Sequence, residues 1–149
     1  MDVLNPRSKL YVYPHSGTFS ANPISLTAGL AAMEKFDRSE VARLNGMAER
    51  AIASIREMIR ETGAKASVTG GGSMFRVHMK ATPPTNYREA HLTTDENKRL
   101  RVMLDNMFDA GFILINSCSC ALSTPMTDRD IDDLVSTMRG GFEKIAAMP

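Results

Sequence analysis

The chain has 149 residues, 43% of them hydrophobic, and its 18 basic and 17 acidic side chains leave a formal net charge of +1. This length suffices for one domain that buries about 70% of its unfolded surface without disulfides. The balanced charge disfavours a nucleic-acid or anionic-membrane partner. The sequence has neither an apolar run of about 20 residues nor the order of a signal peptide, so we expect a cytoplasmic protein that does not bind a membrane.

The two cysteines, Cys118 and Cys120, are separated by one residue. In an extended strand both side chains point the same way, so a disulfide between them is difficult to form. Two thiols cannot close a zinc site, and no histidine has a recognisable ligand spacing from them. We therefore predict reduced packing residues and no metal site.

The first half of the chain predicts two helices. Asn22 is a good N-cap and Pro23 suits the first helical position, so one helix is expected from Pro23 to about Phe36. Asp37 begins a capping box for a second helix, which Gly63 ends. The apolar stripe of this second helix follows the i, i+3, i+4, i+7 rule over Val41, Leu44, Ala48, Ala51, Ile52, Ile55 and Ile59.

From Ala64 onward the spacing of the hydrophobic residues changes from the helical period towards a period of two residues, which is typical of strands. Residues 66–69 and 73–79 are predicted strands, with a tight turn at the glycines 70–72. These glycines do not form a phosphate loop, because neither the Lys-Ser/Thr pair of a Walker motif nor a helix follows them. Residues 80–92 are predicted to form a surface loop.

The remaining segment predicts helix, strand, strand and helix. Thr93 caps the first helix and Gly111 stops it. Residues 112–115 form a continuous apolar run suited to a strand buried on both faces, and residues 120–123 are a shorter partner. Thr127 opens the last helix. Two apolar stripes are expected in the core: Leu100, Met103, Leu104, Met107 and Phe108, then Ile131, Leu134, Val135, Met138, Phe142 and Ile145.

The resulting fold class is α+β, with a three- to four-stranded sheet covered by helices on one face. The most informative stretch precedes the first helix, at residues 15–23. There Ser16, Gly17 and Thr18 can present backbone amides and two hydroxyls to an anion, and a glycine lets the anion approach closely. A phosphate group fits such a turn.

This stretch and its continuation resemble the "H-x-G-T-x-x-x-N-P…A-x-A-A-L" signature of class III pyridoxal-phosphate-dependent aminotransferases, glutamate-1-semialdehyde 2,1-aminomutase and its relatives above all. A second anchor is Asp130-Ile131-Asp132, similar to the family's C-terminal "D-I-D". The resemblance implies the C-terminal small domain of a fold-type I enzyme. It also implies that Gly17 and Thr18 contact the cofactor phosphate from the neighbouring subunit of a dimer.

Other parts of the family's chemistry have no counterpart in this sequence. Lys9 is the only lysine before the turn, and its surroundings do not resemble the motif of the Schiff-base lysine. Counting back from Asp130 places the family's active-site glutamate on Cys118. We therefore assign no catalytic residue, expect weak or absent pyridoxal phosphate binding and no activity from this chain alone, and leave a sister aminotransferase open beside the aminomutase.

These expectations divide the chain at Asn22. Residues 1–22 would connect it to a missing large cofactor-binding domain, with Met1 at an internal position, and residues 23–149 would form the small domain. In the intact enzyme the domain would supply a phosphate contact and part of the pocket for a small amino or keto substrate. The apolar helix expected from Pro23 to about Phe36 predicts self-association of the isolated chain. The alternative is a free-standing, non-catalytic binding module derived from this fold.

Overall fold

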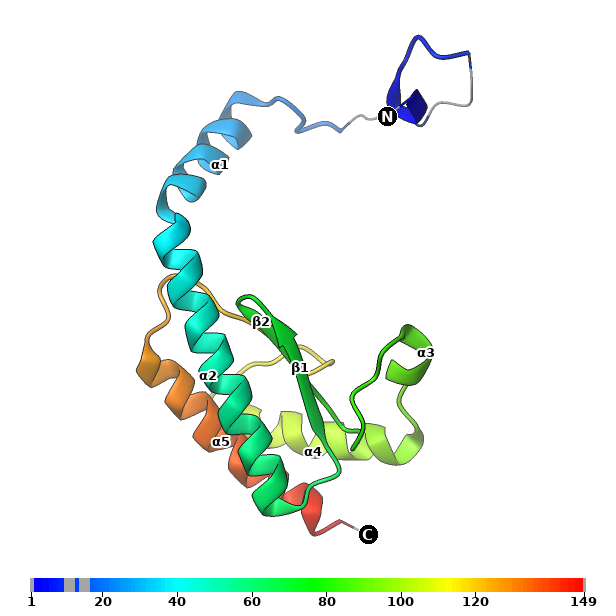
Figure 1. Ribbon diagram of the computed structural model, residues 1–149, viewed down its shortest axis with the longest axis vertical. Helices are drawn as coiled ribbons and strands as arrows, with labels where there is room; N and C mark the ends of the chain where they lie inside the picture. The colour runs from blue at the N-terminus through cyan, green and yellow to red at the C-terminus, as the bar shows by residue number, and fades with distance from the viewer. Residues whose placement is uncertain (1, 10–12, 14–16, 149) are drawn as a thin grey trace. The chain divides into compact units, whose positions relative to one another are not determined.

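The computed structural model describes residues 2–9, 13 and 17–148 and has two compact units, Met1–Asp37 and Arg38–Pro149 (Figure 1). Ser16 of the predicted anion turn, and His15 before it, lie outside the described residues. In chain order the elements are η1 (Asp2–Leu4), α1 (Pro23–Lys35), α2 (Arg38–Thr62), β1 (Ser67–Gly71), β2 (Met74–His78), α3 (Tyr87–Ala90), α4 (Thr94–Asp109), β3 (Ser119–Ala121) and α5 (Asp128–Ala146). No helix in the described part of the chain is long and apolar enough to cross a membrane.

The first unit is dominated by α1, which begins where the sequence predicts. The Asn22 side chain accepts hydrogen bonds from the backbone N–H groups of Ile24 and Ser25, at 3.0 and 3.3 Å, and Pro23 takes the first helical position. None of the α1 residues is buried. A Cβ added at Gly29, in the middle of this helix, would meet nothing within 4 Å among the described residues.

The second unit is built on α2, whose apolar stripe is confirmed from Leu44 to Ile55, with Ile59 packed at its edge. The helix ends as predicted, because Gly63 adopts a φ of +69° and donates its N–H to the Ile59 carbonyl at 3.1 Å. Helix α2 packs against α5 and against β1. Arg43 links α2 to the segment before α5, because its guanidinium donates to the carbonyls of Thr124, at 2.8 Å, and Met126, at 3.0 Å.

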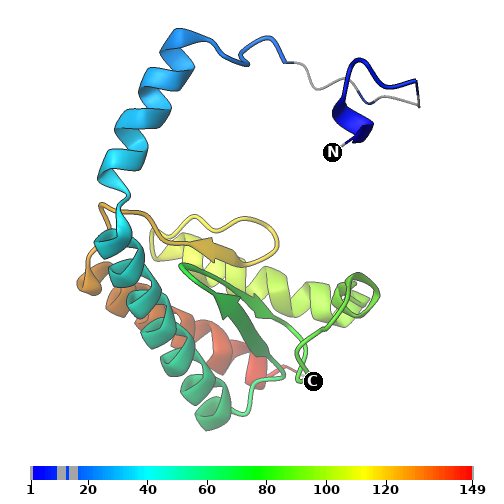
Figure 2. The same ribbon diagram turned by 45° about the horizontal axis from the view of Figure 1, so that its top comes forward.

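The sheet has three antiparallel strands in the order β1-β2-β3 (Figure 2). The predicted hairpin between β1 and β2 is confirmed, with Gly72 in its turn at a φ of +58°. Gly70 and Gly71, which were predicted to lie in the turn, are the last two residues of β1. In the ladder Val68 pairs with Val77, and Phe75 pairs with Cys120. These four side chains are buried, so one face of the sheet points into the core.

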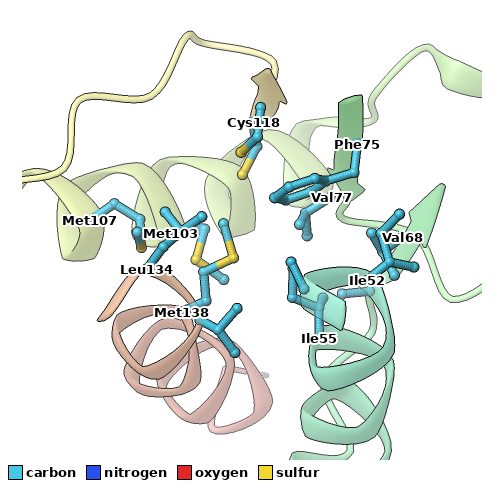
Figure 3. Close-up of a cluster of buried hydrophobic side chains, with 14 of the residues drawn as sticks. Ile52, Ile55, Val68, Phe75, Val77, Met103, Met107, Cys118, Leu134 and Met138 are labelled. Atoms are coloured by element: carbon cyan, nitrogen blue, oxygen red, sulfur yellow. The ribbon is translucent and has the colours of Figure 1, made fainter. Parts of the chain in front are cut away.

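Helices α2, α4 and α5 supply the other side of this core (Figure 3). Phe75 and Val77 from β2 point towards the helices, as does the thiol of Cys118. Met103 and Met138 are fully buried and fill the space between α4 and α5. Flexible thioether side chains suit such irregular gaps. All six residues of the stripe predicted in the last helix are buried.

Three local expectations were wrong. Phe108 is 67% exposed, because it lies on the outer side of α4 rather than on the face that carries Met103 and Met107. The predicted surface loop contains a short helix, α3, that Asn86 caps by accepting from the Glu89 N–H at 3.0 Å. Residues 112–115 are not a buried strand and have no ladder partner.

Candidate functional site

The Gly17-Thr18 turn immediately precedes α1, and both residues are exposed. The Gly17 carbonyl accepts from the Ser20 N–H at 2.9 Å, and the Phe19 carbonyl accepts from the Asn22 N–H at 3.3 Å. These bonds close a compact turn before the capped helix. An added Cβ on Gly17 would stand 3.0 Å from the Ser20 Oγ, a contact that rotation of the Ser20 side chain relieves. The peptide N–H of Thr18 and its hydroxyl are the donors that such a turn can offer to a phosphate.

A second surface that could contact a ligand is the outer face of the sheet, opposite the helices. Thr69, Arg76 and Ser119 form one row across the three strands, because Arg76 pairs with both of the others in the ladder. The next row, towards the turn, carries Met74, which is 60% exposed. Of the two adjacent residues Met74 and Phe75, Met74 lies on this open side and Phe75 is buried in the core.

Arg76 connects this outer face to the segment before β3. Its Nε donates to the Ser117 carbonyl at 3.1 Å, and the Ser117 and Ser119 hydroxyls are 2.9 Å apart. A guanidinium and two hydroxyls therefore lie together at the edge of the sheet. Sequence reasoning missed this group, because the contact spans 41 residues. The only local signal was a charged residue alternating with the buried Phe75 and Val77.

The segment from 112 to 115 alternates in burial without forming a strand. Phe112 and Leu114 are half-buried, whereas Ile113 is 86% and Ile115 is 61% exposed. A cavity of about 230 Å³ lies between this segment, β3 and α5, and its lining includes Phe112, Leu114 and Leu134. The exposed isoleucines and this cavity give the region an apolar character.

Cys118 does not stand where an active-site carboxylate could act. Its side chain is fully buried and points into the core (Figure 3), and its backbone adopts a φ of +55°. Burial raises the pKa of the Cys118 thiol to about 12 and that of Cys120 to about 11. Both cysteines are free, as the sequence predicts, and thiols with such pKa values are poor nucleophiles near neutral pH.

Among the described residues, the exposed Gly17-Thr18 turn offers an N–H and a hydroxyl that could meet the phosphate of pyridoxal phosphate. We assign no residue of this chain to the lysine that attaches the cofactor covalently. The buried Cys118 likewise cannot replace the family's glutamate.

The chain is similar along nearly its whole length to known enzymes. Glutamate-1-semialdehyde 2,1-aminomutase from Laribacter hongkongensis (strain HLHK9) is 30% identical over 97% of this chain and 34% of the relative. The enzyme of the same name from Tropheryma whipplei (strain Twist) is 26% identical over 100% of this chain and 31% of the relative. The chain thus spans about a third of the length of the curated relatives it matches. No family model matches it.

Solved structures give the same result for the fold. An omega-transaminase from Sphaerobacter thermophilus has a TM-score of 0.83 and 30% identity, over 99% of this chain and 33% of the transaminase. A transaminase with PLP bound has a TM-score of 0.75 and 26% identity, over 98% and 33% of the two chains. A β-phenylalanine aminotransferase from Variovorax paradoxus, 24% identical with a TM-score of 0.76, supports the fold alone.

Together these findings define the class: the chain is similar in sequence and in fold to the C-terminal domain of class III pyridoxal-phosphate-dependent aminotransferases. Among the curated relatives it is similar in sequence to glutamate-1-semialdehyde 2,1-aminomutase.

Proposed function

We propose that this chain acts as the C-terminal domain of an aminotransferase or aminomutase and holds the phosphate of pyridoxal phosphate through Gly17 and Thr18. The observation that supports this most directly is the exposed turn before α1, in a chain similar to an omega-transaminase over 99% of its length. The Thr18 hydroxyl and the turn amides donate to phosphate oxygens, and glycine keeps the approach open. The cofactor, when bound, supplies the chemistry of amino-group transfer.

The outer face of the sheet completes the chain's contribution as one wall of the substrate pocket. Arg76 provides a positive charge without a carboxylate partner among the described residues, which suits the carboxylate of an amino or keto acid. Met74 and the exposed Ile115 provide apolar surface around it. In this role the chain's residues bind and orient the substrate, and the lysine that reacts belongs to a large domain.

The same proposal covers the division of the chain into two parts and the assembly of the enzyme as a dimer. Residues 1–22 connect to the large domain, residues 23–149 form the small domain, and the phosphate contact is made across a dimer. We also propose a cytoplasmic location, in keeping with two buried free thiols. Self-association of the isolated chain follows from the exposed apolar side chains of α1.

The DNA upstream of the Met1 codon provides the first test. An in-frame sequence encoding a lysine-bearing large domain is the expected finding. An unrelated promoter there, or aminotransferase turnover by the purified 149-residue chain with added pyridoxal phosphate, would contradict the proposal.

In the assembled enzyme the phosphate contact is tested by substitution. Thr18→Val removes one hydroxyl donor to a dianion, so we expect about tenfold weaker retention of pyridoxal phosphate, measured by dialysis and absorbance. Ser25→Ala, which removes a hydroxyl from the first turn of α1, is the matched control and should leave retention unchanged. Equal retention in wild type and Thr18→Val would remove Thr18 from the site.

A further inference from the structure

A basic pocket lies on the second unit, between the loop after α2, the segment that carries α3, and the start of α4. Its volume is about 560 Å³, which is within the range of small-molecule sites. Four basic side chains and two carboxylates line it, with His91 and two prolines: Lys65, Lys80, Arg88, Arg99, Glu89, Glu96, Pro83 and Pro84. Neither Gly17, Thr18 nor the outer row of the sheet belongs to it.

Both carboxylates of the pocket are already engaged. Glu96 accepts from the Lys80 Nζ at 2.7 Å and from the Thr93 N–H at 2.8 Å, and the side chains of the Lys80–Glu96 pair are only 18% and 14% exposed. Glu89 accepts from the N–H and hydroxyl of Thr85, each at 2.8 Å, and from the Asn86 amide at 2.7 Å. These bonds hold the carboxylates away from the remaining cations.

Lys65, Arg88 and Arg99 therefore stay without a carboxylate within 4.0 Å among the described residues. Arg99 is the least satisfied of them. Its Nη2 donates to the Met79 carbonyl at a long 3.4 Å, and its Nε is buried without a partner in the part of the chain that the structure describes. A buried donor on a charged group that lacks an acceptor is costly, so the Arg99 guanidinium is poorly compensated where its side chain lines the pocket.

We propose that this pocket is a binding site for a small organic oxyanion with two or more negative charges, a phosphate ester or a di- or tricarboxylate. The lining carries four cationic and two anionic side chains, a net charge of +2, which favours a multivalent anion over a monocarboxylate. The hollow is also larger than a single phosphate group needs, which leaves room for an organic body against Pro83 and Pro84. The proposal does not depend on the function proposed above, because none of its residues contributes to the phosphate turn or to the outer sheet face.

The test is a titration of the full 149-residue chain, followed by backbone amide NMR at constant ionic strength. Inorganic phosphate, succinate and acetate are the three probes. We expect saturable shifts around residues 79–84 and the start of α4 for phosphate or succinate, and at least about tenfold weaker binding of acetate. The stronger of the two divalent probes identifies the phosphate ester or the polycarboxylate as the ligand class.

Arg99→Gln should weaken the stronger probe's binding at least about tenfold, since it removes a charged hydrogen-bond donor. Arg101→Gln is the matched control on the same helix, because Arg101 is 78% exposed and paired with Asp105, and it should leave the affinity within about twofold. If Arg99→Gln does not fold, the exposed Lys65→Gln and Arg88→Gln carry the same expectation. The proposal is overturned if no probe binds saturably, if acetate binds as well as the divalent probes, or if the pocket variants bind like wild type.

Discussion

At the scale of single residues, the tightest point of the sheet is Gly70 in β1. An added Cβ there would stand 2.6 Å from the Met74 carbonyl oxygen, 2.7 Å from the Ile52 Cδ1 and 2.8 Å from the Phe75 Cβ. Two of these atoms are fixed by the backbone, so the strand cannot yield without distorting the hairpin. The adjacent Gly71 has nothing within 4 Å of the same position.

We therefore expect Gly70→Ala to lower the free energy of unfolding by about 1–3 kcal/mol, as overpacking does in a filled core. Gly71→Ala, its matched control, should change the stability by no more than about 0.5 kcal/mol. Urea denaturation of the two variants measures both values. Equal stabilities for the two variants would show that the hairpin is not closed as tightly as described.

His78 makes the stability depend on pH. It is buried, with its Nε2 2.8 Å from the Thr69 Oγ1, and its pKa is lowered by burial first and then by the charges of Arg76 and Lys80. The unfolded chain binds the proton on His78 more readily than the folded chain does. The contribution of neutral His78 to the free energy of unfolding is therefore fully present above about pH 6.5. It falls as the pH drops from there through the lower folded-state pKa.

Denaturation between pH 7.5 and 5 should show this loss in wild type and a smaller pH dependence in His78→Gln. The glutamine variant has its own stability, so only the slope with pH is compared. His15 and His91 remain in both proteins and provide a common background. A steeper slope in the variant would contradict the direction of the pKa shift.

At the scale of elements, the helix termini were the most predictable features. Thr93 and Thr127 cap α4 and α5, each in a capping box with the acidic residue three positions later, as the spacing indicates. Such caps depend on local sequence alone, because donor and acceptor lie within one turn. The glycine hairpin was predictable for the same reason.

Elements that depend on distant partners were not predictable. The run 112–115 has the composition of a buried strand, but the β3 ladder with β2 covers only Ser119–Ala121, so the run alternates in burial without a partner strand. Apolar composition cannot reveal whether a neighbouring strand is available. Arg76 and Ser117 meet for the same kind of reason, through pairing far along the chain. In contrast, the Gly17-Thr18 turn was identified from a local motif, and its phosphate contact remains a prediction.

The cap of α5 gives a prediction at this scale. The Thr127 Oγ1 accepts from the Asp130 N–H at 3.4 Å, and the Asp130 carboxylate accepts from the Thr127 N–H at 2.7 Å, which lowers the Asp130 pKa. Thr127→Ala should cost about 1 kcal/mol of unfolding free energy, and Thr127→Ser should keep most of it. Chemical denaturation of the pair checks this, and equal losses would exclude the hydroxyl as the stabilising group.

At the scale of the whole molecule, stability resides in the second unit. Among the described residues, the hydrophobic core contains no side chain before Leu44, and α1 buries none of its own. A chain of residues 38–149 should therefore unfold in one cooperative transition, with a midpoint within a few degrees of the full chain. Calorimetry of both chains measures this, and loss of the transition on removing residues 1–37 would show that the first unit supports the core.

The exposed side chains of α1 determine how the full chain behaves in solution. Ile24, Leu30 and Met33 are 80%, 60% and 75% exposed, an apolar surface that monomeric proteins seldom leave in water. We expect the full chain to form dimers or larger species in sedimentation experiments as its concentration rises. Residues 38–149 should remain monomeric, because the chain then lacks that helix. Leu30→Glu with Met33→Glu should likewise shift the full chain towards monomer, whereas Lys35→Glu, which changes charge on the same helix without removing apolar surface, should not. A full chain that stays monomeric at high concentration would show that α1 does not mediate association between copies.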